Sequence, residues 1–212
     1  MIRFLLISCL AIISTMSAAG QTSDFEKAYH ACIRVHTAFN DGFVHAEQLE
    51  EAAGTLRTLQ IGALQLQQIK GEKHSLNGHL VFTSNFILDC IDNQSIYAMA
   101  DKYAKDQQSF RGGDVLMNTL LLKAGTSATY KIRNCRDVVN IGCVAEPNGL
   151  FSWKLKMEDI VTHAITEEIK DNLDEIKGRI SRHQKTKGKH YHLILEITNT
   201  STVDSSFVII AQ

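Results

Sequence analysis

Two histidines near the end of the chain, His190 and His192, have a spacing that can hold a metal ion. They flank Tyr191, and alternate side chains of a strand point to the same face. His163 or His183 would supply a third nitrogen for a zinc-type site. No carboxylate or cysteine is placed to complete such a shell. The sequence therefore favours a solvated strand edge over a metal site. His190 and His192 are the only metal candidates, and no cofactor is predicted.

A thiol nucleophile is the second chemistry to weigh. Cys90 follows Asp89, and His74 or His79 would be its base. Cys90 falls on the same helical stripe as Phe86, which favours core packing or a disulfide. The chain contains no G-x-S-x-G or H-E-x-x-H motif, no phosphate-binding Gly-Lys loop and no dinucleotide fingerprint, and we predict no catalytic residue.

The cysteines permit more than one pairing. Cys32, Cys90, Cys135 and Cys143 lie beyond the N-terminal leader, and four cysteines allow three pairings. Cys135 and Cys143 are predicted to pair if segments 126–135 and 137–145 form a hairpin, where facing Cα atoms reach the roughly 4.4–6.8 Å that a disulfide needs. Cys32 and Cys90 are expected to be buried, as free thiols or as a second pair.

Residues 1–20 read as a cleavable signal peptide. Arg3 gives the positive start, an apolar core runs from Phe4 to Ile13, and cleavage is expected near Ala19 or Gly20. The core is about half the roughly twenty residues of a membrane anchor. A lipoprotein signal ending at Cys9 would have a still shorter core. We expect an exported protein with no transmembrane segment in its mature chain.

The N-terminal part, 21–112, is predicted to be mainly helical. Apolar residues recur at three- and four-residue steps over 25–39 and 45–58, and Thr83 or Ser84 would cap a helix through Phe86 and Cys90. A further helix is predicted around 96–103. The short apolar runs 64–66 and 80–82 are predicted to pair as a small hairpin.

The C-terminal part, 113–212, is predicted to be an antiparallel β-sandwich, which makes the fold class α+β. Short apolar runs follow one another between turn residues. Trp153 alternates with charged neighbours, and we predict that it is buried rather than a sugar-binding platform. Segment 160–180 suits either one long helix or strand and loop, with a slight preference for the latter. The run Phe207–Ile210 is predicted to be a strand that is buried on both faces or lies against the helical part.

The C-terminal part resembles a known group of domains. The order Leu122-Lys-Ala-Gly-Thr126, a series of strands, Leu195-Glu-Ile-Thr-Asn-Thr200 and a final apolar strand resembles pre-peptidase C-terminal domains, small β-sandwiches appended to exported bacterial proteins. The acidic Asp-Leu strand motif of that group is missing here. The whole chain is also similar to uncharacterised exported proteins of Bacteroides-like bacteria. The resemblance implies architecture and compartment, and it carries over no functional residue.

Two functions remain open at this point. The first is a non-enzymatic binding or assembly module at the cell envelope, with an envelope protein or glycan as its partner. The second is a hydrolase-like enzyme with a site between the two parts, where His74, His79 and Arg111 would lie, because clefts between domains favour ligand sites. The formal net charge is −1, and the basic run 179–190 suits a solvated loop better than a nucleic-acid patch, so no nucleic acid is expected.

Overall fold

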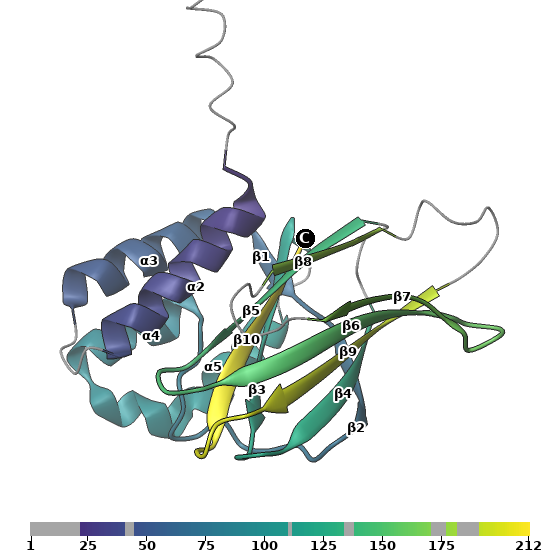
Figure 1. Ribbon diagram of the computed structural model, residues 1–212. Helices are drawn as coiled ribbons and strands as arrows, with labels where there is room; N and C mark the ends of the chain where they lie inside the picture. The colour runs from purple at the N-terminus through teal and green to yellow at the C-terminus, as the bar shows by residue number, and fades with distance from the viewer. Residues whose placement is uncertain (1–21, 41–44, 110–111, 134–137, 171–176, 182–190) are drawn as a thin grey trace, which may run out of the picture.

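The computed structural model describes residues 22–40, 45–109, 112–133, 138–170, 177–181 and 191–212. Its fold is α+β and has three layers, in which helices cover one face of a sheet and a second sheet covers the other (Figure 1). The expected signal peptide lies outside the described residues, as do Arg111, Cys135, His183 and His190.

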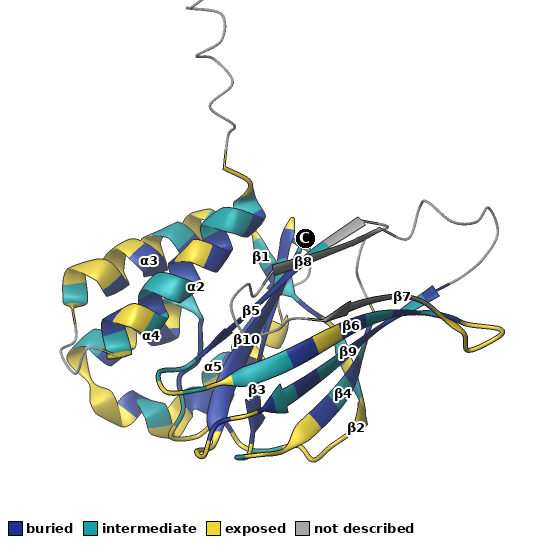
Figure 2. Ribbon diagram, in the orientation of Figure 1, coloured by how far each residue is buried: buried dark blue, intermediate teal, exposed yellow. Residues whose placement is uncertain are grey.

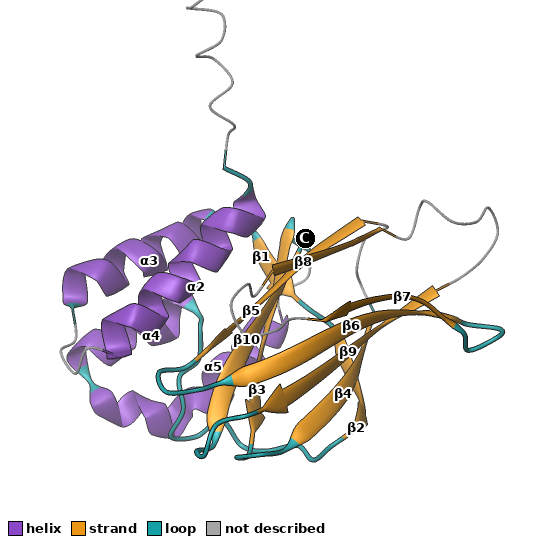
Figure 3. Cartoon of the chain, viewed as in Figure 1, coloured by secondary structure: helices purple, strands orange, loops and turns teal. Residues whose placement is uncertain are grey.

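The helical layer comes almost entirely from the N-terminal part, as predicted (Figure 3). Thr83 is the N-cap of α4 (Ser84–Asp92), and its hydroxyl accepts the backbone N–H of Phe86 at 3.3 Å, which satisfies one free donor of the first turn. The helices are α2 (Asp24–Asn40), α3 (Ala46–Thr58), α4 (Ser84–Asp92), the 3₁₀ helix η2 (Gln94–Met99) and α5 (Ala100–Ser109).

Two five-stranded sheets form the sandwich. Sheet A has the order β1 (Ile61–Ala63), β3 (Val115–Leu122), β10 (Ser205–Ala211), β5 (Val138–Ala145) and β8 (Lys177–Ser181). Sheet B has the order β2 (Leu66–Lys70), β4 (Ser127–Ile132), β9 (Tyr191–Asn199), β6 (Phe151–Asp159) and β7 (Ile165–Lys170). Neighbouring strands are antiparallel, except that β1 runs parallel to β3. The sandwich therefore includes β1 and β2, which come from the N-terminal part.

The last strand, β10, lies in the middle of sheet A and is buried along its whole length (Figure 2). Phe207 and Ile209 point into the core between the two sheets, whereas Val208 and Ile210 point into the core beneath the helices. A strand covered on both faces cannot alternate apolar with polar residues, which accounts for the unbroken apolar run. The prediction of a doubly buried terminal strand is confirmed.

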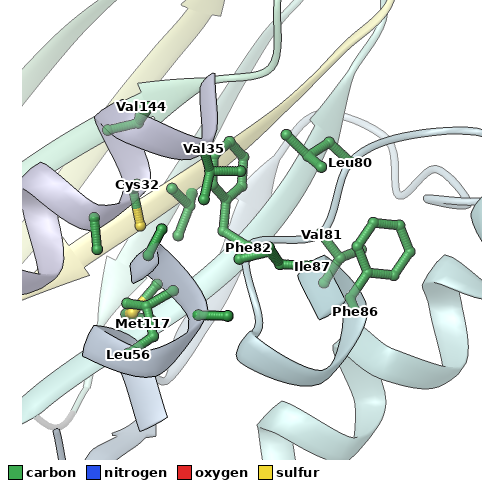
Figure 4. Close-up of a cluster of buried hydrophobic side chains, with 14 of the residues drawn as sticks. Cys32, Val35, Leu56, Leu80, Val81, Phe82, Phe86, Ile87, Met117 and Val144 are labelled. Carbon is green, nitrogen blue, oxygen red and sulfur yellow. The ribbon is translucent and has the colours of Figure 1, made fainter. Parts of the chain in front are cut away.

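The core between the helices and sheet A is built from side chains of both parts (Figure 4). Cys32 of α2 and Ile87 of α4 meet Met117 and Val144 of sheet A there, together with the loop residue Phe82. The second core, between the sheets, contains the buried Trp153, as predicted. The first of these cores thus joins the helices to the sandwich.

Both predicted hairpins are wrong. Residues 80–82 form a buried loop, and Leu66 pairs instead with Ile132 of β4. Similarly, β4 and β5 follow each other in sequence but lie in opposite sheets. Burial of two apolar faces against a common core outweighs the pairing of neighbouring segments. The geometric basis for a Cys135–Cys143 disulfide is therefore lost, and Cys135 itself lies outside the described residues.

The ambiguous segment 160–180 contains strands. β7 pairs with β6, and β8 pairs with β5, so the two strands belong to different sheets. The long helix is therefore wrong, and the preference for strand and loop is confirmed.

Candidate functional site at the junction of helices and sandwich

A carboxylate–histidine pair joins the loop before α4 to the sandwich. His79 Nδ1 lies 2.7 Å from Glu146 Oε1, and the Glu146 side chain is only 13 % exposed. The same carboxylate accepts the backbone N–H of Leu80 at 3.0 Å and that of Ser206 at 2.9 Å. The hydrogen bond that His79 donates to the Glu146 carboxylate raises the pKa of His79 above its ordinary value, although burial acts in the opposite direction.

This group contains serine, histidine and a carboxylate, but not in the order that nucleophilic catalysis needs. A catalytic serine donates to the histidine, and the carboxylate holds the far side of the ring. Here Ser206 Oγ lies 2.7 Å from the carbonyl oxygen of Leu80 and 3.0 Å from Glu146 Oε2, and Ser206 is completely buried. The His79–Glu146–Ser206 cluster therefore acts as a structural clamp between the layers.

A cavity of about 650 Å³ lies at the edge of the molecule where α5, sheet A and sheet B come together. This volume falls within the roughly 300–1,000 Å³ typical of ligand pockets. One wall is a face of α5 with Asp101, Ala104, Lys105 and Gln108, which are spaced three and four residues apart. The remaining lining comes from 63–68, 72–76, 118–121, Tyr130 and Arg133.

Hydrogen bonds fix the polar wall of the cavity. Asp101 accepts from the hydroxyl of Ser75 at 2.6 Å and from the backbone N–H of Leu76 at 2.7 Å. The Arg133 guanidinium contacts the side-chain oxygen of Gln67. Tyr130 is buried, and burial raises the pKa of its hydroxyl to about 12, so the phenol stays neutral at physiological pH. The cavity thus combines fixed hydrogen-bonding groups with exposed basic side chains.

Thr119 is an unsatisfied group in this cavity. The residue is 4 % exposed, and its hydroxyl oxygen is buried without a hydrogen-bond partner in the described part of the chain. An unmade hydrogen bond of a buried hydroxyl costs about 1–3 kcal/mol. Its neighbour Asn118 is buried as well, but its side-chain amide donates to the carbonyl oxygen of Leu64 at 2.8 Å.

The residues proposed from sequence for a junction site do not converge. His74 lines the cavity, whereas His79 belongs to the clamp, and Arg111 lies outside the described residues. The cavity residues that the sequence reasoning missed are Thr119 and Asp101. The sequence could have pointed to Thr119 and Asn118, because they are the only polar residues in the apolar run of β3.

Cys90 belongs to the helical core, as predicted, and burial raises the pKa of its thiol to about 12. Burial also raises the pKa of the Cys32 thiol. A thiol that stays protonated is a poor nucleophile. The geometry therefore gives Cys90 a packing role.

Of the two predicted metal candidates, His192 is described by the structure, and it does not line the cavity. His192 lies on β9, where partial burial and then the charges of Lys131 and Arg133 lower its pKa. His163, at the β6–β7 turn, is 2.9 Å from Glu158 Oε1. Within the described ranges, no three histidine, cysteine or acidic side chains group closely enough to hold a metal ion. His190 lies outside those ranges.

No known protein-family model matches the chain, and no curated protein is significantly similar to it. Among the helices that the structure describes, none combines the length and the apolar character needed to cross a bilayer. What defines the candidate site is therefore its own geometry, a polar cavity at the open edge of an α+β three-layer fold.

Proposed function

We propose that this protein is an exported, non-enzymatic binding or assembly module of the cell envelope, and that the cavity under α5 is its ligand site. The observation that carries the proposal is a cavity lining on which hydrogen bonds already hold Ser75, Leu76 and Asp101 in place. A site of this kind is ordered before its ligand arrives, which lowers the entropic cost of binding.

A binding role is supported over hydrolysis by how the candidate nucleophiles are engaged. Ser75 donates to Asp101, and the hydroxyl of Ser206 is held inside the clamp. Neither hydroxyl contacts a histidine among the residues that the structure describes. The export part of the proposal is supported by the sequence of residues 1–20 alone.

Export is tested by mass spectrometry of the protein recovered from the envelope and from the medium. A mature N-terminus at Gly20 or Gln21 is expected. An intact Met1 in the membrane fraction, or a lipid-modified Cys9, would refute the proposed processing.

The ligand site is tested by photo-crosslinking in the native cell. A benzophenone amino acid is placed at Gln108, an exposed residue of the cavity lining, and at Gln48, an exposed residue of α3 that does not line it. A discrete adduct is expected from position 108 and not from position 48. The same adducts from both positions, or none from position 108, would contradict a ligand site in this cavity.

A further inference from the structure

One edge of β3 is only partly covered. β1 pairs with it from Val115 to Met117, and the chain then turns away to sheet B, where Leu66 pairs with β4. From Asn118 to Leu122, no strand of the described chain lies along this edge, although β10 pairs with the opposite edge throughout.

The backbone groups on the open edge can be assigned from the last hydrogen bond of the covered part. The N–H of Leu64 donates to the carbonyl oxygen of Met117 at 2.9 Å, so the polar groups of Met117 point toward the β1 side. Successive residues of a strand point their N–H and C=O groups to alternate sides. The N–H and C=O groups of Thr119 and Leu121 therefore point to the open edge.

The cavity follows this edge and does not lie over a face of the sheet. All four residues from Asn118 to Leu121 line it, although their side chains alternate between the two faces of sheet A. A pocket over one face would be lined by every second residue. The facing segment Gln65–Gln68 also lines the cavity with consecutive residues. Beside the wall formed by α5, the cavity is thus bordered by the edge of β3 and by the facing segment 65–68.

We propose that the cavity binds a short, extended, acidic peptide, which adds to the open edge of β3 as a strand and hydrogen-bonds to the backbone of Thr119 and Leu121. Backbone pairing of this kind is an established mode of peptide recognition. This inference rests on the proposed function and names its ligand class.

The preference for acidic side chains comes from the charged groups of the lining. Lys73, Lys105 and Arg133 are exposed there. Of the two acidic residues, Asp101 already accepts two hydrogen bonds, which leaves Glu72 as the only other carboxylate of the lining. Complementary charge favours a ligand of negative sign.

The first test uses the mature chain and a display library of random octapeptides, followed by fluorescence anisotropy with the strongest binder. Each backbone N–H of that peptide is then replaced in turn by N-methyl. Strand addition predicts a loss of affinity of tenfold or more at every second position and little change at the intervening ones, because only alternate N–H groups face β3. Uniform tolerance, or losses without this period, would overturn the proposal.

The second test changes the protein. Thr119→Pro removes an N–H that points to the open edge and leaves the pairing with β10 intact, so the fold should persist, and the peptide should bind at least tenfold more weakly. Thr119→Val retains the shape and the backbone N–H, and because the hydroxyl oxygen of Thr119 is buried, it should leave peptide binding unchanged. Thr37→Val, on the exposed face of α2, is the matched control and should change nothing.

Failure of this inference can be told apart from failure of the proposed function. A glycan or other non-peptide adduct at position 108, with no octapeptide selected, would retain the cavity as a ligand site and refute the peptide. Self-association through this edge, seen as a dimer in sedimentation and abolished by Thr119→Pro, would refute a separate peptide partner.

Discussion

Removal of the Glu146 carboxylate is expected to destabilise the protein strongly. Glu146→Ala leaves the backbone N–H groups of Leu80 and Ser206 without their acceptor, and both residues are fully buried. Each unsatisfied donor costs about 1–3 kcal/mol, so the free energy of unfolding should fall by roughly 2–6 kcal/mol. The hydroxyl of Ser206 retains the carbonyl oxygen of Leu80 and adds nothing to this cost.

The measurement is urea unfolding followed by circular dichroism, combined with thermal melting. For a chain of this length, each 1 kcal/mol corresponds to about 2–4 °C in Tm, so a loss near 4 kcal/mol lowers Tm by roughly 8–16 °C. Glu146→Gln retains a carbonyl oxygen as acceptor and should cost less than Glu146→Ala.

The matched control is Glu196→Ala, which removes a carboxylate from the ion pair with Lys156 on the outer face of sheet B. A pair of this kind, with one partner exposed, is worth about 0–1 kcal/mol. If Glu146→Ala proves no more harmful than Glu196→Ala, the clamp does not join the layers, and the reasoning from buried donors fails.

Three further predictions concern pH, the terminal strand and the thiols. The folded state raises the pKa of His79 above 6.5, so the ion pair with Glu146 stabilises the protein fully below about pH 6.5 and is lost as the pH rises through the folded-state pKa. Urea unfolding from pH 5 to 9 should show this decline in the free energy of unfolding. The decline should be absent in His79→Ala. Deletion of residues 207–212 removes the centre of sheet A, where four apolar side chains contribute on the order of 6–10 kcal/mol, and should yield insoluble product; a soluble truncation with an unchanged Tm would refute this. Cys32 and Cys90 should resist alkylation in the folded protein and react in denaturant, as mass spectrometry of labelled peptides would show, and rapid labelling of the native protein at either residue would contradict their burial.

The sequence predicted secondary structure correctly where contacts between residues close in the chain determine it. The helix stripe through Phe25 and Cys32 and the cap at Thr83 depend on neighbours within a few residues, and both predictions are confirmed. The burial of β10 on both faces could also be predicted, because an unbroken run of apolar residues is typical of a strand that is covered on both sides.

The pairing of the strands could not be predicted from the sequence, because paired strands in this fold are far apart in the chain. Leu66 pairs with a strand that begins about sixty residues later, and Phe207 pairs with both β3 and β5. The assumption that adjacent apolar runs form hairpins failed in both cases where it was used. The cavity was hidden for the same reason, since its lining comes from several separate stretches of the chain.

The clamp and the cavity are connected through one loop, and this connection bears on how the site works. Ser75 and Leu76 are held by Asp101, the N–H of Gly78 donates to the carbonyl oxygen of Tyr97 at 2.7 Å, and residues 79–80 are held by Glu146.

The loop wall of the cavity is thus fixed at its cavity end by α5 and at its other end by the sandwich. A ligand that enters meets groups already in place and does not have to order them. Loss of the Glu146 contacts frees the far end of this loop, so Glu146→Ala should weaken ligand binding although Glu146 does not line the cavity. The same substitution would then report on stability and on the order of the site, and a variant that is destabilised yet binds normally would show that the Asp101 contacts alone hold the wall.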